Sequence, residues 1–133
     1  MPRLAHVALL FGRALRLRCP ACAGRPLFTS WFRLREACPG CGLLLARKEE
    51  GYYIGAMALN LVVSESLFIL LLTGVAWATW PAVPWNAILY GGVALMVLAP
   101  LAFFPFSRTL WLAFDLLFRP VTRGEIRSTR TRE

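Results

Sequence analysis

Four cysteines in two matched pairs are the residues of this chain whose types and spacing could do chemistry. Cys19 and Cys22 form the first CxxC pair, Cys38 and Cys41 form the second, and fifteen residues separate the pairs. Two CxxC pairs at this spacing are typical of a structural zinc site with four thiolate ligands. Because four thiolates fill the tetrahedral positions of Zn²⁺, the site would be structural rather than catalytic.

Other uses of the four thiols have less support. Iron is the alternative occupant, because four thiolates hold iron in the same geometry. Two disulfides would need an oxidising compartment, and the charge distribution described below predicts a cytoplasmic location. A redox dithiol usually has one CxxC pair at a helix N-terminus instead of two matched pairs. We therefore expect one zinc ion with four cysteine ligands.

The residues that flank the cysteines fit two tight turns around a metal. Pro20 and Pro39 fix φ just after the first ligand of each pair. Gly24 and Gly42 follow the second ligand of each pair and give the backbone freedom to turn back toward sulfur.

The spacing predicts a zinc ribbon over residues 19–50. Residues 26–29 and 32–35 can form a short β-hairpin, and residues 43–46 read as a third strand. Residues 47–51 read as a charged hinge between this head and the rest of the chain. A head of about 40 residues needs a metal or another cross-link to fold.

The composition predicts a membrane protein. Hydrophobic residues make up 58% of the 133 residues, and the mean hydropathy is +0.58, which is too apolar for an ordinary soluble domain. We expect a transmembrane hairpin over residues 52–106, with spans at about 52–80 and 85–106, because about 20 apolar residues cross a bilayer. Tyr52 and Trp80 lie near the two ends of the first span, as in an aromatic belt.

Two structures are open for residues 107–118, which follow the second span. One straight helix over residues 85–118 would exceed the thickness of a bilayer, so we expect a break near Pro105. Ser107 could then cap an interfacial helix over residues 107–118. A tilted extension of the second span is the alternative. Residues 119–133 read as a basic disordered tail.

The basic residues set the expected topology. The net charge is +8; nine basic residues precede the first span, six follow Phe106, and the connecting turn has none. Because positive charge collects on the cytoplasmic side, both termini are expected in the cytoplasm. Residues 1–18 are expected to form an amphipathic helix on the membrane surface. The basic residues expected to face anionic lipid or a partner are Arg13, Arg16, Arg108, Arg119 and Arg123.

Glu65 is the only ionisable residue deep in the first span. It lies about 16 Å along the helix from Ile54, near the middle of a bilayer, where an ionised carboxylate is costly. It could be a neutral acid bonded to a nearby group, a proton or metal relay, or a contact for a partner subunit. Asn60 and Ser64 share a helix face and could seat another helix.

No catalytic set is visible. The chain has one histidine, His6, and one aspartate, Asp115. There is no nucleophile paired with a base and no glycine-rich phosphate loop. We expect neither an enzyme nor a small-molecule substrate. The aromatic and basic residues of the head could bind nucleic acid, but a head beside a membrane favours packing on the bilayer and anionic lipid, so no nucleic-acid partner is expected.

With these motifs in view, the chain resembles the small bacterial membrane proteins catalogued as domain of unknown function 983. Ala23 stands where members usually carry glycine, and Tyr52-Tyr53 where Gly-Pro is common. The resemblance implies a bacterial inner-membrane protein with two spans and a cytoplasmic zinc ribbon, without an assigned activity. Members often lie near genes for the assembly of haem-copper oxidases. The likeness rests on Arg18-Cys19-Pro20-Ala21-Cys22, Leu27-Phe28, Cys38-Pro39-Gly40-Cys41-Gly42, Gly51, Glu65 and Ser107-Arg108-Thr109-Leu110-Trp111.

One function is expected, and two others are kept as alternatives. The first is a non-enzymatic accessory factor or small subunit of a membrane complex, such as a respiratory one, with a membrane-protein partner. The second is a metal-handling assembly factor for a haem-copper oxidase. The third is a membrane-tethered nucleic-acid binder.

Overall fold

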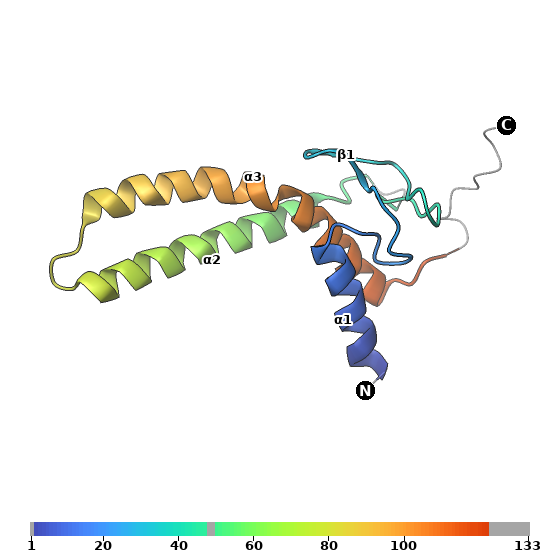
Figure 1. The fold of residues 1–133 in the computed structure, drawn as a ribbon, viewed down its shortest axis with the longest axis horizontal. Coiled ribbons are helices and arrows are strands. Elements are labelled where there is room, and N and C mark those ends of the chain that lie inside the picture. The colour runs from blue at the N-terminus through green and yellow to red at the C-terminus, as the bar shows by residue number, and fades with distance from the viewer. Residues whose placement is uncertain (1, 48–49, 123–133) are drawn as a thin grey trace.

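A small head and a pair of long helices make up the chain in the computed structural model, which describes residues 2–47 and 50–122 (Figure 1). The predicted architecture, a short β-hairpin beside four clustered cysteines and then two long apolar helices, is confirmed. The elements in chain order are α1 (Pro2–Leu15), β1 (Phe28–Ser30), β2 (Arg33–Leu34), α2 (Ile54–Thr79) and α3 (Trp85–Phe118).

The helices α2 and α3 run antiparallel and form the long part of the molecule (Figure 1). Both are long and apolar enough to cross a membrane, with mean hydropathies of 2.0 and 2.2. Only 11% of the most apolar window of each helix is buried within the chain. The two helices approach closely where Gly92 faces Phe68, because a Cβ on Gly92 would lie 2.6 Å from the Phe68 ring.

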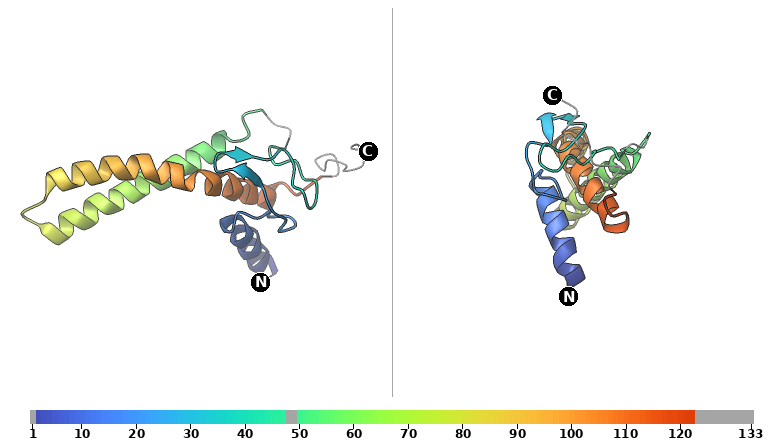
Figure 2. Two further views of the ribbon diagram at one scale, coloured as in Figure 1. Left: turned by 45° about the horizontal axis from the view of Figure 1, so that its top comes forward. Right: turned by 90° about the vertical axis from the view of Figure 1, so that its right-hand side faces the viewer.

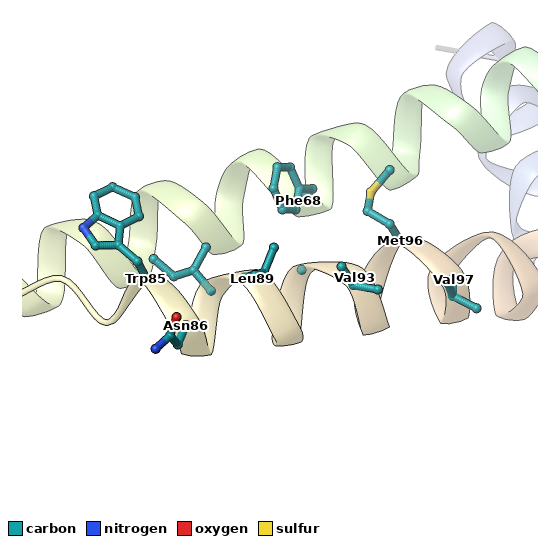
Figure 3. Close-up of a pocket in the computed structure, with 9 residues that line it drawn as sticks. Phe68, Trp85, Asn86, Leu89, Val93, Met96 and Val97 are labelled. Carbon is teal, nitrogen blue, oxygen red and sulfur yellow. The ribbon is translucent and has the colours of Figure 1, made fainter.

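A groove of about 600 Å³ lies between the two helices near their connecting turn (Figure 3). Phe68 of α2 and Met96 of α3 extend into the space between the helices, whereas Asn86 points away from α2 (Figure 3). The lining has no ionisable side chain, so it offers contacts suited to hydrocarbon.

The predicted break near Pro105 is absent, because α3 continues to Phe118 as one helix of 34 residues. Pro105 has no N–H to donate to the carbonyl of Leu101, four residues earlier. The indole N–H of Trp31 donates to that carbonyl at 2.8 Å. Because a donor from outside the helix satisfies this carbonyl, α3 continues past Pro105. The helix bends between its orange and its red part (Figure 1). Residues 107–118 therefore extend the second helix, and Ser107 bonds to the Phe104 carbonyl within it.

The ribbon is smaller than predicted. The strands β1 and β2 pair antiparallel, with Phe28 opposite Leu34, and the pairing has a local irregularity. The predicted third strand over residues 43–46 is reduced to bridge residues at Leu43 and Leu44, and Leu44 pairs with Ala37. This segment pairs with the chain just before the second cysteine pair, since the Leu45 N–H bonds to the Glu36 carbonyl at 3.0 Å.

The last third of α3 is the centre of the head, not an interfacial helix. Leu112 and Leu116 of α3 join one buried cluster with residues from both cysteine turns and from the ribbon. On a neighbouring face of α3, Ala113 packs against α1 through Leu10 and Ala14. The ribbon members of the main cluster are Cys19, Leu27, Cys38, Leu43 and Leu45.

The helix α1 ends at Leu15, three residues before its predicted end. Leu17 has a positive φ of 54°, which a right-handed helix cannot contain. The carbonyl of Ala14, in the last turn, accepts a hydrogen bond from Thr109 Oγ1 at 3.0 Å. This bond fixes the end of α1 to α3.

Candidate metal centre

The four cysteine sulfurs lie within 4.8 Å of one another. The Sγ atoms of Cys19 and Cys41 are 3.9 Å apart, and those of Cys22 and Cys38 are 3.5 Å apart. A disulfide would need about 2.05 Å, and all four thiols are free. A tetrahedral ion with metal–sulfur bonds of about 2.3 Å would separate its ligands by about 3.8 Å. The cluster therefore fits one four-coordinate metal ion.

The two cysteine turns repeat the same backbone geometry. The N–H of Ala23 bonds to the Cys19 carbonyl at 2.7 Å, and the N–H of Gly42 bonds to the Cys38 carbonyl at 2.9 Å. Both turns place a left-handed residue just after the second cysteine, with φ of 63° at Ala23 and 75° at Gly42. Of the two glycines that the sequence interpretation singled out, Gly42 has the left-handed conformation, whereas in the first turn Ala23 has it and not Gly24.

Gly24 and Gly40 have a different role, because they bring the backbone close to the sulfurs. The N–H of Gly24 donates to Cys22 Sγ at 3.3 Å. A Cβ on Gly24 would lie 3.1 Å from that sulfur and 3.2 Å from Cys38 Sγ, and a Cβ on Gly40 would lie 3.0 Å from Cys22 Sγ. A side chain at either position would therefore press on the ligands.

The sulfurs differ in their surroundings. Burial raises the pKa of Cys19 far above its usual range, and burial also raises the pKa of Cys41. At Cys22 burial raises the pKa, but hydrogen bonds from the Gly24 N–H and from the neighbouring thiols outweigh it, and the net pKa is lowered. Because burial disfavours the thiolate, a bound cation would supply the charge that stabilises the four ligands together.

Replacing Ala23 with glycine is expected to stabilise the head by about 1 kcal/mol, because a left-handed conformation costs an L-residue about that much. Thermal unfolding of the metal-loaded protein would measure the gain. Ala21→Gly is the matched control, since Ala21 is exposed in the same turn and has no positive φ. A glycine at position 23 that lowered the melting temperature as the control does would contradict the expectation.

The basic residues expected to face lipid or a partner have more specific contacts. Arg13 donates from Nη1 to the carbonyls of Pro20 and Ala21, both at 3.1 Å, and so joins α1 to the first cysteine turn. Arg16 is exposed. Arg123 lies outside the described residues.

Arg108 is held by aromatic rings. Its guanidinium carbon lies 4.3 Å from the centroid of the Tyr53 ring and 4.6 Å from that of Phe104. Burial raises the pKa of Tyr53 to about 12, although Arg108 acts in the opposite direction. The phenol therefore stays neutral at ordinary pH, and a cation–π contact anchors the arginine at the start of α2.

A buried ionic cluster joins the end of the ribbon to the end of α3, and the sequence interpretation did not find it. Arg47 was assigned to a charged hinge, but its side chain is only 1% exposed and donates to Asp115 Oδ2 at 2.8 Å. Arg47 also donates to the carbonyls of Arg119 and Pro120 at the C-terminus of α3. Tyr52 donates to the same carboxylate at 3.1 Å, and Arg119 approaches it at 3.6 Å.

One signal could have indicated this cluster. Asp115 is the only aspartate of the chain and lies in an apolar segment, where a carboxylate needs a cation and hydrogen-bond donors. The carboxylate of Asp115 also raises the pKa of Tyr52, after burial itself, so the phenol remains a donor.

The polar residues of α2 divide between two faces. Asn60 donates to the Pro100 carbonyl of α3 at 3.0 Å, and Ser64 is buried and bonds to the Asn60 carbonyl. These two residues therefore lie at the contact with α3. Glu65 is exposed and lies about 100° around the helix from the buried Ser64. The structure brings Glu65 together with neither the cysteines nor the Asn60–Ser64 face.

Four clustered thiols in a small β-hairpin head, docked on two long apolar helices, define a metal-ribbon protein with two candidate membrane spans. The family model described as "Protein of unknown function (DUF983)" matches residues 28–115, and the chain belongs to this family. The matched region contains the second cysteine pair, Glu65 and Asp115, whereas Cys19 and Cys22 precede it. No curated protein and no solved structure matched the chain.

Proposed function

We propose that this protein is a non-enzymatic, zinc-containing membrane protein that serves as an accessory factor or small subunit of a membrane complex, such as a respiratory one. In this proposal α2 and α3 cross a bacterial inner membrane. The head and both termini lie in the cytoplasm. The partner is another membrane protein.

The exposed apolar surface supports the membrane location. Side chains along both helices are exposed although they are apolar, for example Ile69 at 54% and Val97 at 56%. A contiguous surface of this kind is far larger than soluble monomers tolerate. Trp77, Trp80 and Trp85 gather around the connecting turn, where indole rings favour the membrane–water boundary.

The closed set of four thiolates supports zinc as the metal. Structural zinc sites use four protein ligands and no open position, and a reducing cytoplasm keeps the thiols available. Elemental analysis of the purified protein checks this part of the proposal. We expect one zinc per chain, and a chain that carries iron at the same ratio would overturn the assignment.

The single observation that carries the accessory role is the placement of Glu65. Its side chain lies on the outer surface of α2, about 16 Å from the start of the helix by its rise per residue. Glu65 forms no hydrogen bond or ion pair within the described part of the chain. A carboxyl group facing lipid at this depth is costly, and a donor on a neighbouring transmembrane helix would remove that cost.

Co-purification from native membranes tests the role, with Glu65→Leu as the variant. The wild-type protein should recover one membrane protein in stoichiometric amount, and Glu65→Leu should recover at least about tenfold less, a change of 1.4 kcal/mol or more. Ser66→Leu is the matched control, because Ser66 is also exposed but lies about 100° around the helix. Equal recovery with Glu65→Leu, or no partner in any mild detergent, would contradict the proposal.

A second candidate is the metal-handling role in the assembly of a haem-copper oxidase. The exposure of Cys22 favours it, because an acceptor thiol could approach the ion from this side. Transfer of the metal to an acceptor protein without unfolding of the head would support it. Retention of the metal against strong chelators would exclude it.

The aromatic residues that a nucleic-acid binder could use for stacking are in contact with α3. Trp31 packs on Phe106, and Phe32 packs on Phe104.

A further inference from the structure

A pocket of about 330 Å³ lies between α1 and the first cysteine turn, and three arginines line it. None of these arginines takes part in the ion pairs that the described residues form around Asp115. Several positive charges around one hollow create a potential that attracts an anion. The lining consists of Leu9, Gly12, Arg13, Arg16, Arg18 and Ala23.

The three arginines keep hydrogen-bond donors available. Arg13 uses Nη1 for the carbonyls of Pro20 and Ala21, which fixes its guanidinium at the pocket wall. The Nε of Arg18 is buried without a hydrogen-bond partner. Arg16 is exposed at the opening. A guanidinium has five N–H donors. Within the described residues Arg13 uses Nη1 alone and Arg16 is exposed, so both keep donors for a bound anion.

The surface of α1 divides into three faces, and only one of them packs on the protein. Leu10 and Ala14 are buried against α3. Leu4 and Leu15 lie on a second face and are 68% and 56% exposed. The third face carries Leu9, Gly12 and Arg13, which line the pocket. Arg16 lines the same pocket from the turn that directly follows α1.

The position of α1 relates these faces to a membrane, if the membrane location proposed above holds. α1 lies across the long axis of the helical pair (Figures 1 and 2). It contacts α3 at Thr109 and Ala113, close to Trp111, whose ring covers Gly55 in the first turn of α2. α1 is thus at the level where the first span begins, which is the depth of an interfacial helix.

We propose that this pocket binds the phosphate of an anionic phospholipid headgroup. The guanidinium groups of Arg16 and Arg18 donate to the phosphate oxygens, and the remaining N–H groups of Arg13 complete the shell. The acyl chains of the same lipid lie beside the exposed apolar face that carries Leu4 and Leu15. A phospholipid is favoured over free phosphate because this apolar face adjoins the pocket on the same helix.

Lipid binding to the purified full-length protein tests the proposal. Native mass spectrometry in detergent would follow titration with phosphatidylglycerol for the wild type and for Arg16→Gln/Arg18→Gln. The matched control is Arg33→Gln/Arg35→Gln, which removes two charges from exposed positions of the ribbon. We expect roughly tenfold or greater loss of affinity in the pocket variant, because charge-assisted hydrogen bonds are lost. The control should change affinity by about twofold or less.

Further measurements distinguish a lipid headgroup from free phosphate, and failure of the pocket proposal from failure of the proposed membrane location. Equal losses in the pocket variant and the control would overturn the pocket, as would complete displacement of the lipid by inorganic phosphate. If the double variant loses its metal, Arg16→Gln alone, at an exposed side chain, takes its place in the comparison with the control. A wild type that retains neither phosphatidylglycerol nor phosphatidylcholine would overturn the membrane location as well. Failure to find a protein partner has no bearing on this measurement.

Discussion

Replacing Cys38 with serine is expected to abolish metal binding and unfold the head. Cys38 is 2% exposed and belongs to the same buried cluster as Leu112 and Leu116. Structural zinc sites supply about 10–16 kcal/mol of apparent binding energy, which equals or exceeds the whole stability of about 5–15 kcal/mol of an ordinary domain. A head this small cannot compensate for such a loss with its remaining apolar contacts.

Metal content and limited proteolysis would measure this outcome. The variant should carry less than one metal ion for every ten chains, and its ribbon should be cleaved rapidly while α2 and α3 stay intact. Ala21→Ser is the matched control, because it adds a hydroxyl at an exposed position of the other cysteine turn. A Cys38→Ser protein with full metal content and a protected ribbon would show that the four sulfurs do not act as one site.

Replacing Arg47 with methionine is expected to lower the free energy of unfolding by about 3–5 kcal/mol, because it leaves a buried carboxylate without its cation. The Arg47 side chain is 1% exposed and that of Asp115 is 11% exposed. The variant also removes the donors to the carbonyls of Arg119 and Pro120 at the end of α3. Unfolding by denaturant in detergent would measure the change.

Arg119→Met is the control for this prediction. Arg119 contacts the same carboxylate, but at 3.6 Å and with a side chain that is 49% exposed, so its loss should cost about 1 kcal/mol or less. The double variant Arg47→Met/Asp115→Leu should recover part of the loss, since it removes both members of the buried pair. Equal costs for Arg47→Met and Arg119→Met would show that burial does not set the strength of this contact.

The features that sequence alone predicted are those carried by local patterns. The spacing of the cysteines gave the four-sulfur cluster, because each CxxC turn places two sulfurs together whatever surrounds it. The lengths of the apolar runs predicted α2 and the part of α3 up to residue 106. These patterns do not show which residue, distant in sequence, forms a hydrogen bond or an ion pair with a group that lacks a partner nearby.

Pro105 and Asp115 show that limit most clearly. Pro105 predicts a helix end because it removes the donor to the Leu101 carbonyl, but Trp31, seventy residues before Leu101, supplies one. Asp115 demands a cation, but the cation comes from Arg47, sixty-eight residues away. The apolar stripe of residues 107–118 predicted contact with a membrane, because an amphipathic pattern does not reveal what covers it. The ribbon and α1 cover it.

The packing of the ribbon on Leu112 and Leu116 has a consequence for biosynthesis. The cysteine pairs leave the ribosome before both apolar segments, and the part of α3 that completes their core follows those segments. Most domains fold as soon as they emerge, but this head has to wait for its own C-terminal helix. The four-cysteine cluster therefore packs against its complete core only once the translating chain has passed both candidate spans.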